Sequence, residues 1–146
     1  MVATLPPAGS RSTFAERPTH LPPMAQAQWL AARAAAVGFD FADVAGARAK
    51  VVEEWQELQE ALDLGAPRAA IEGELGDVLL ALVNLARHLA LDPEVALAGT
   101  LARFQRRFAL VEADLAAQGG RFETADRATM AHLWQAAKAK KRGSAP

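Results

Sequence analysis

The chain has 146 residues, of which 51% are hydrophobic, and its 17 acidic and 16 basic residues leave a formal net charge of -1. This length allows one domain with a substantial core, and the balanced charge indicates neither a nucleic-acid nor a membrane partner. The absence of cysteine excludes disulfides, thiol catalysis and cysteine-ligated zinc. No apolar run approaches the roughly 20 residues of a membrane span, so we expect a cytoplasmic protein.

Helix signals follow one another along the chain, and no segment shows a strand-like alternation of useful length. Residues 1–22 are rich in proline, serine, threonine and glycine, which predicts a flexible N-terminal arm. Glycine, aspartate and proline then delimit five expected helices at 23–37, 44–64, 67–91, 93–118 and 127–141. Short connections favour antiparallel neighbours. We therefore predict an all-α antiparallel bundle forming a single domain over residues 23–142, with a loose tail at 143–146.

Acidic side chains lie in an unusual place on the third expected helix. A rotation of about 100° per residue puts Glu74, Asp77, Asn84 and His88 in a narrow band that apolar side chains border. Glu74 and Asp77 stand about two turns after the helix begins, which is beyond the reach of the helix dipole. A carboxylate in such surroundings needs a compensating partner, because burial otherwise favours its neutral form. Asn84 and His88 are interpreted as residues that make core or interface hydrogen bonds.

The second expected helix carries a matching acidic pair. Glu54 and Glu57 lie at positions i and i+3 beside an apolar stripe, and Glu53 lies further round toward water. One such pair is as a rule a solvated helix face. Antiparallel packing, however, could bring this pair opposite Glu74 and Asp77, and four anions repel strongly unless a cation lies among them. Ligands that offer only oxygen favour Mg²⁺ or Mn²⁺ over zinc.

Basic and aromatic residues on the last two expected helices suit a phosphorylated ligand. Arg103 and Arg107 lie one turn apart, and planar guanidinium groups can donate two hydrogen bonds at once to phosphate oxygens. Trp134 and Lys138 are also one turn apart, where an aromatic plane can stack on a base. The alternatives are a solvated basic edge for the arginines and ordinary helix docking for Trp134. Phe39 is interpreted as a packing residue.

Three segments together resemble a known family: KVVEEWQELQEAL, then GELGDVLLALVNLARHLALDPEVAL, then RFQRRFALVE. They look like the MazG family of all-α nucleoside triphosphate pyrophosphohydrolases, and the likeness covers roughly residues 21–142. The resemblance implies Mg²⁺-dependent conversion of a (d)NTP and water to (d)NMP and pyrophosphate, with Mn²⁺ as a substitute, in the service of nucleotide-pool house-cleaning. It also implies an active site in a four-helix core. The apolar surface on both sides of the third helix independently favours a homodimer.

The resemblance also assigns roles to individual residues. The implied magnesium ligands are Glu54, Glu57, Glu74 and Asp77. The implied catalytic carboxylates, one of which would position the attacking water or take its proton, are Glu53 and Glu57. The implied substrate-binding residues are Lys50, Arg103, Arg107, Trp134 and Lys138.

Two departures from the family pattern leave other functions open. Gly73 stands where a glutamate is usual, and Leu101 stands where an asparagine is usual, so the substrate preference is open. The alternatives are a dUTP or phosphoribosyl-ATP pyrophosphatase of the same superfamily, or a non-catalytic helical dimer that senses nucleotide. A di-iron carboxylate bundle is disfavoured because its Glu-x-x-His motif is absent. The four principal carboxylates are intact, so we expect metal binding.

Overall fold

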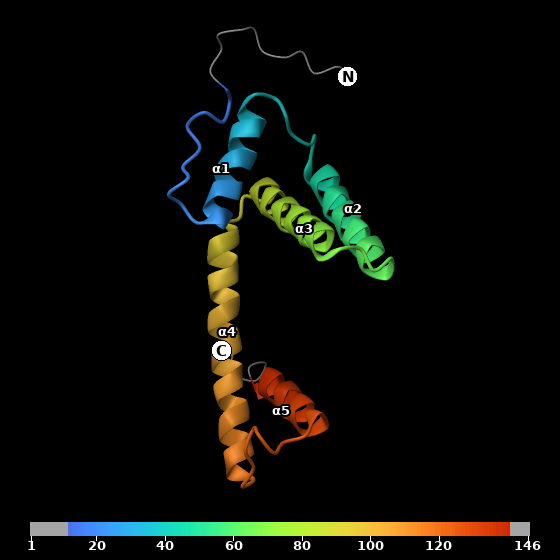
Figure 1. Ribbon diagram of the computed structural model, residues 1–146. Helices are drawn as coiled ribbons and strands as arrows, with labels where there is room; N and C mark the ends of the chain where they lie inside the picture. Colours follow the sequence, from blue (N-terminus) through green and yellow to red (C-terminus); the bar gives the residue numbers. More distant parts are fainter. Residues whose placement is uncertain (1–11, 141–146) are drawn as a thin grey trace. The chain divides into compact units, whose positions relative to one another are not determined.

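The computed structural model describes residues 12–140, and within this range the chain forms five helices and no strand (Figure 1). The helices are α1 (Pro23–Ala36), α2 (Val44–Asp63), α3 (Arg68–His88), α4 (Pro93–Ala117) and α5 (Arg127–Lys140). The predicted all-α class is confirmed, and every helix begins and ends within three residues of its expected limits. Residues 1–11 of the predicted arm and all of the predicted tail lie outside the described residues.

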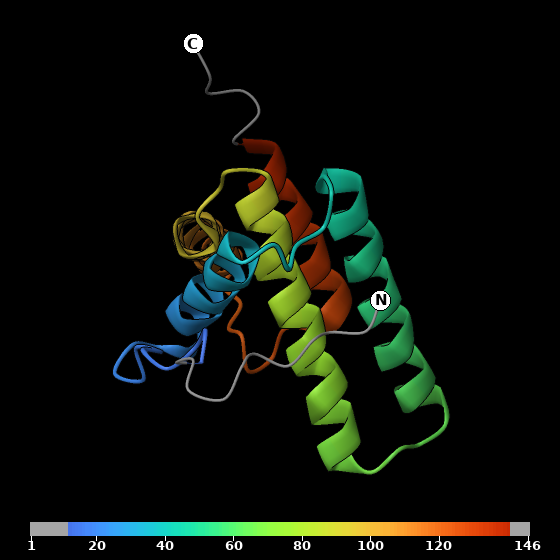
Figure 2. The same cartoon turned by 90° about the horizontal axis from the view of Figure 1, so that it is seen from above.

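The described residues form two compact units, one that ends at Glu94 and one that begins at Val95. In the first unit α2 and α3 pack side by side and antiparallel, while α1 packs on α3 (Figure 2). The second unit contains almost all of α4 and the whole of α5. The grouping of residues 23–142 into one domain stays a prediction.

Local signals explain where α2 and α3 begin and end. Asp43 caps α2, since its carboxylate accepts a hydrogen bond of 2.8 Å from the backbone N–H of Gly46. Gly65 has a φ of 62°, a left-handed conformation that glycine adopts without strain, and it reverses the chain after α2. Pro67 has a φ of -55° and immediately precedes α3. The sequence predicts Pro67 as the first residue of this helix, and the helix begins one residue later. This short turn sets α3 antiparallel to α2.

The core of the first unit is small because its helices are rich in alanine. Its buried apolar residues all lie on α2 and α3, and they are Ala47, Leu58, Val78, Ala81 and Val83. Small side chains let two helix backbones approach closely, so polar groups placed along this contact are drawn together. The pairing of α2 with α3 therefore decides which carboxylates meet.

The second unit has a separate core where the C-terminal half of α4 meets α5. Val111 and Leu115 of α4 and Leu133 and Ala137 of α5 are all buried and pack together. Phe122, in the loop between the helices, stacks on Phe108 with ring centroids 5.0 Å apart. Among the described residues, no helix combines the length and the apolar content needed to cross a bilayer.

Truncation of Leu58 tests the packing that holds α2 against α3. Only 6% of this residue is exposed, so Leu58→Ala should lower the free energy of unfolding by about 2–5 kcal/mol. Leu64, just after the same helix, is 83% exposed, and Leu64→Ala should change it by less than about 0.5 kcal/mol. Urea denaturation followed by circular dichroism measures both variants. Equal effects would show that Leu58 does not belong to a packed core.

Candidate metal centre and adjoining cavity

Three carboxylates from α2 and α3 converge on one point. Glu54 and Glu57 lie one turn apart on α2, Glu74 comes from α3, and one oxygen of each lies within 4.8 Å of the other two. Ligand oxygens lie about 2.1 Å from a bound Mg²⁺ ion, and hence at most about 4.2 Å from one another. The observed spacing is close to this limit, and small side-chain rotations would close the difference. These residues could therefore hold one hard divalent cation.

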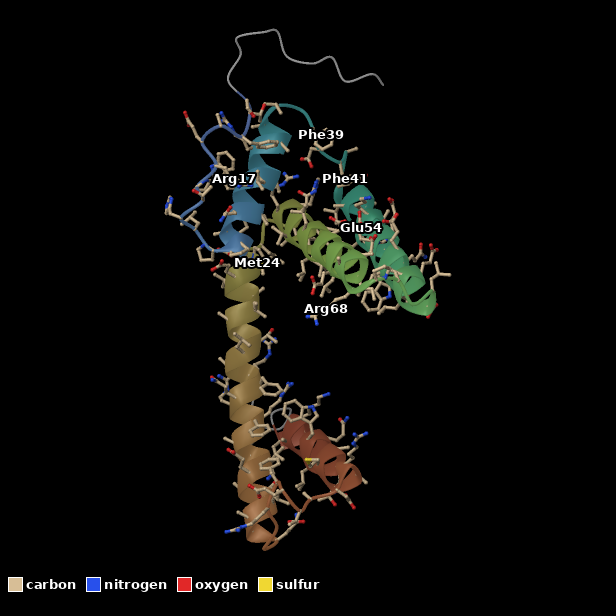
Figure 3. All side chains as sticks on the ribbon, viewed as in Figure 1. Arg17, Met24, Phe39, Phe41, Glu54 and Arg68 are labelled. Carbon is tan, nitrogen blue, oxygen red and sulfur yellow. The ribbon has the colours of Figure 1, made fainter. Side chains whose placement is uncertain are left out.

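Glu54, which Figure 3 marks on α2, is the buried member of this cluster and is only 7% exposed. Lys50 compensates its charge, because the ammonium nitrogen lies 2.6 Å from Glu54 Oε1. The same nitrogen donates a hydrogen bond of 2.7 Å to Oε1 of Glu53, whose side chain is 57% exposed. Hydrogen bonds to Glu53 and Glu54 hold the pKa of Lys50 above its usual value, so the lysine stays charged. The i, i+4 spacing of Lys50 and Glu54 could have indicated this pair from the sequence.

The pKa of Glu57 reflects the excess of negative charge at the cluster. The charge of Glu54 raises the pKa of Glu57 above its ordinary value of 4.5, and partial desolvation and the charge of Glu74 add to the effect. Lys50 opposes the shift but does not cancel it. One cation thus faces several anions within the described residues. A bound divalent cation would relieve the repulsion that remains.

A cavity of about 480 Å³ adjoins the acid cluster. Its charged lining residues include Lys50, Glu54 and Asp77, and most of the remaining lining is apolar and comes from α1, α3 and the segment between α1 and α2. Asp77 is exposed and lies one turn along α3 from Glu74. The carboxylates within 4.8 Å of one another do not include that of Asp77, so its part as a fourth ligand stays a prediction.

Asp40, in the segment between α1 and α2, ties this segment to the end of α3. Its carboxylate accepts hydrogen bonds from Arg87 and from Nε2 of His88, the latter at 2.9 Å. The hydrogen bond from Arg87 is the main cause that lowers the pKa of Asp40 to about 2. Arg87 Nε also donates to Oδ1 of Asn84 at 3.0 Å. The predicted hydrogen-bonding roles of Asn84 and His88 are thus confirmed.

In the segment between α1 and α2, the exposure of Phe39 differs from expectation. Phe39 is 82% exposed and Phe41 is 38% exposed, and both line the cavity. Figure 3 labels them in the segment between α1 and α2. The interpretation of Phe39 as a packing residue is therefore wrong. The physical reason is that Gly38, with a φ of 85°, ends α1 and turns the chain away from the helix core before Phe39. Sequence reasoning missed Asp40 and Phe41, because no local pattern relates them to α3.

The remaining predicted substrate contacts belong to the second unit. Arg103 Nη2 donates a hydrogen bond of 2.7 Å to Oγ1 of Thr100. Arg107 Nε is buried and has no hydrogen-bond partner within the described residues. Trp134 packs on Phe104 with ring centroids 5.2 Å apart, which fits the helix-docking alternative, and Lys138 is exposed. The roles of these residues toward a nucleotide stay predictions.

The raised pKa of Glu57 has a measurable consequence for stability. A carboxyl group whose pKa is higher in the folded chain costs folding free energy when it ionises. This cost is absent below pH 4.5, the ordinary pKa, and grows as the pH rises through the folded pKa. At pH 7 without divalent cations, Glu57→Gln should therefore raise the thermal midpoint, and the gain should vanish below about pH 4.5.

The exposed Glu60, on the same helix, supplies the matched control. Glu60→Gln should leave the midpoint almost unchanged, because this residue lies outside the cluster. Added Mg²⁺ should stabilise the wild-type chain and the control more than Glu57→Gln. Thermal scans with EDTA and with Mg²⁺ measure these differences. Equal midpoints for both variants at every pH would contradict the charge repulsion.

Comparison with known proteins agrees with this geometry. Residues 43–111, which include all three clustered carboxylates, match the family model of the MazG nucleotide pyrophosphohydrolase domain. The chain is 40% identical over 128 residues to proteins of Escherichia coli (strain K12) and Escherichia coli O157:H7, both named nucleoside triphosphate pyrophosphohydrolase. Each of these matches covers 87% of this chain and 49% of the relative.

A further relative comes from Thermotoga maritima and is named nucleoside triphosphate pyrophosphohydrolase/pyrophosphatase MazG. It is 36% identical over 118 residues, which cover 81% of this chain and 45% of that protein. The chain thus spans about half the length of the curated relatives that it matches. The predicted resemblance is confirmed, because residues 43–111 of this all-helical chain match the MazG domain and most of the chain is similar to relatives named nucleoside triphosphate pyrophosphohydrolase.

Proposed function

We propose that this chain is a Mg²⁺-dependent nucleoside triphosphate pyrophosphohydrolase, which converts (d)NTP and water to (d)NMP and pyrophosphate. The observation that carries the proposal is the convergence of Glu54, Glu57 and Glu74 beside a mostly apolar cavity. A cavity of about 480 Å³ suits a nucleoside in size, and carboxylates can hold the cation that accompanies a triphosphate. The names of the bacterial relatives support the same activity.

In this proposal Mg²⁺, or Mn²⁺ in its place, is held by Glu54, Glu57, Glu74 and Asp77. The fit rests on the chemistry of the donors, since they offer only oxygen and carry more negative charge than Lys50 balances. The bound ion would supply charge neutralisation at the phosphates and acidify water. Lys50 holds the Glu54 carboxylate in its buried position through their ion pair.

A carboxylate beside the cluster takes the proton of the attacking water. The water oxygen forms a bond to the α-phosphorus, the bond to the oxygen bridging the α- and β-phosphates breaks, and pyrophosphate leaves with that bridging oxygen. Glu57 is one candidate for this base, because its carboxylate belongs to the cluster that would hold the ion. Glu53 is the other candidate, and its carboxylate accepts a hydrogen bond from Lys50.

Substrate binding is proposed for five residues that carry a positive charge or an aromatic plane: Lys50, Arg103, Arg107, Trp134 and Lys138. The unpaired donor at Arg107 Nε supports a phosphate contact there, because a buried donor gains free energy from any acceptor that reaches it. Arginine and lysine side chains can stabilise the charge that develops on departing pyrophosphate.

Replacement of single acids on α3 tests the activity. Glu74→Ala and Asp77→Ala should each lower Mg²⁺-dependent pyrophosphate release at least about a hundredfold, because a correctly held cation provides several kcal/mol of transition-state stabilisation. Glu72→Ala is the matched control, since Glu72 lies on the same helix but pairs with Arg68 at 2.8 Å. Full activity in both site variants, with helical content unchanged, would defeat the assignment.

A panel of triphosphates assayed with pyrophosphate detection separates the related activities. Exclusive turnover of dUTP or of phosphoribosyl-ATP would assign the chain to one of those pyrophosphatases of the same superfamily. Nucleotide binding without turnover at high Mg²⁺ would favour a nucleotide sensor, the outcome to which the departures at Gly73 and Leu101 lend support.

A homodimer is part of the same proposal. On α3 the side chains of Leu75, Leu79 and Leu82 follow one another at i, i+4 and i+7, and between 45% and 51% of each is exposed. A stripe of leucines at this spacing is typical of a helix face that packs against another helix. A second copy of the chain, packed about a two-fold axis, would cover this leucine stripe with its own leucine stripe. The α2 and α3 helices of the two copies would then form a four-helix core.

Sedimentation velocity at micromolar concentration tests the dimer. The wild-type chain should sediment as a dimer, and Leu79→Glu should shift it toward the monomer, because a buried charge without a partner weakens an interface. Leu64→Glu, at a residue that is 83% exposed, serves as the control and should stay dimeric. A monomeric wild-type chain would rule out the proposed assembly.

A further inference from the structure

The cavity beside the acid cluster contains a polar group that the proposed hydrolysis does not use. Asn84 of α3 lines the cavity, and its side-chain oxygen accepts the hydrogen bond from Arg87 Nε at 3.0 Å. A guanidinium group only donates hydrogen bonds, so this contact fixes the orientation of the amide, with its oxygen toward Arg87. Within the described part of the chain the Asn84 amide nitrogen makes no hydrogen bond. Two N–H donors therefore remain for a ligand.

A network at the edge of the cavity, which includes the lining residue Asp40, holds this orientation in place. Arg87 pairs with Asp40, and Asp40 also accepts a hydrogen bond of 2.9 Å from His88. Asp40 comes from the segment between α1 and α2, whereas Arg87 and His88 end α3, so two elements hold the guanidinium. The amide of Asn84 is thus pre-oriented, and little entropy is lost when its N–H groups bind an acceptor.

The distance along α3 suits a nucleoside placed between the acids and Asn84. Asn84 follows Asp77 by seven residues, which is two helical turns or about 10 Å. In a nucleotide the α-phosphate and the far edge of the base are separated by a similar length. With phosphates at the acid cluster, the edge of the base would therefore reach Asn84.

The walls between these two points suit a flat ring. Leu80 and Ala81 of α3 and Ala34 of α1 line the cavity with apolar groups, and Phe39 and Phe41 add two aromatic rings. Aromatic rings can stack on any base, so the walls bind a base without identifying it. Discrimination between bases must then come from polar groups at the edge of the base.

We propose that Asn84, positioned by Arg87, selects a base that carries a carbonyl oxygen where adenine carries its amino group. Both free groups of the amide are donors, so they would bind the oxygen at position 6 of hypoxanthine or guanine. An N–H of the amide placed against the amino group of adenine, another donor, would lack an acceptor. This inference rests on the proposed hydrolysis of triphosphates.

The test compares ITP with ATP, since the two differ only at the base edge that Asn84 would face. In wild-type protein with Mg²⁺, kcat/KM for pyrophosphate release should be about tenfold higher for ITP. Asn84→Asp presents an acceptor, so the preference should invert, and Asn84→Ala should bring the ratio close to one. The added charge of the aspartate acts on both substrates alike, so the ratio isolates the contact with the base.

Gln118→Glu makes the same change from amide to acid at an exposed residue after α4, and it should keep the wild-type ratio. Arg87→Lys removes the planar group that orients Asn84, so the ratio should fall toward one, which a purely structural role of Arg87 would not cause.

Wild-type protein that hydrolyses ITP and ATP equally would overturn the inference while leaving the proposed function intact. If no triphosphate is hydrolysed, the proposed function fails. Calorimetric binding of IMP against AMP then decides the inference, and equal affinities would overturn it.

Discussion

The carboxylate of Glu54 is buried where α2 meets α3, and an uncompensated charge there would cost a large part of the stability of a domain of this size. Lys50 supplies the compensation at 2.6 Å, but the lysine is shared with Glu53. Glu57 and Glu74 add further negative charge at the same point. The fold thus gathers more anions than its own cation balances, and a divalent ion is the partner whose chemistry fits this imbalance.

The contact between the two helices also organises the space around the acids. Along α3 the acidic positions come first, then the apolar Leu80 and Ala81, and then Asn84 with Arg87. A single helix therefore presents a charged, an apolar and a hydrogen-bonding surface to one cavity, in the order in which a nucleotide presents its phosphates, its sugar and its base. The segment containing Phe39 and Asp40 encloses the other side of that cavity.

The match to the MazG domain and the geometry of the site cover different residues. The matched residues 43–111 contain the clustered acids and Asn84, whereas Phe39, Asp40 and Trp134 lie outside that span. The chain spans about half the length of its curated relatives. Its activity therefore has to be argued from its own residues and tested on them. The packing of Trp134 on Phe104 illustrates the point, because an aromatic residue already in contact with its own unit has to move or share a face to meet a base.

Much of the fold and part of the site could be predicted because their causes are local. Helix ends depend on residues a few positions apart, so Asp43 and Gly65 indicate the limits of α2 from the sequence alone. The period of the helix places Glu54 beside Glu57, and the short turn at Gly65 puts Glu74 opposite them. By contrast, Asp40 and Arg87 are 47 residues apart, and the exposure of Phe39 depends on how the segment after Gly38 crosses the helices. Such contacts exist only once α1, α2 and α3 have packed, because long-range side-chain geometry follows from packing and leaves no periodic signal in the sequence.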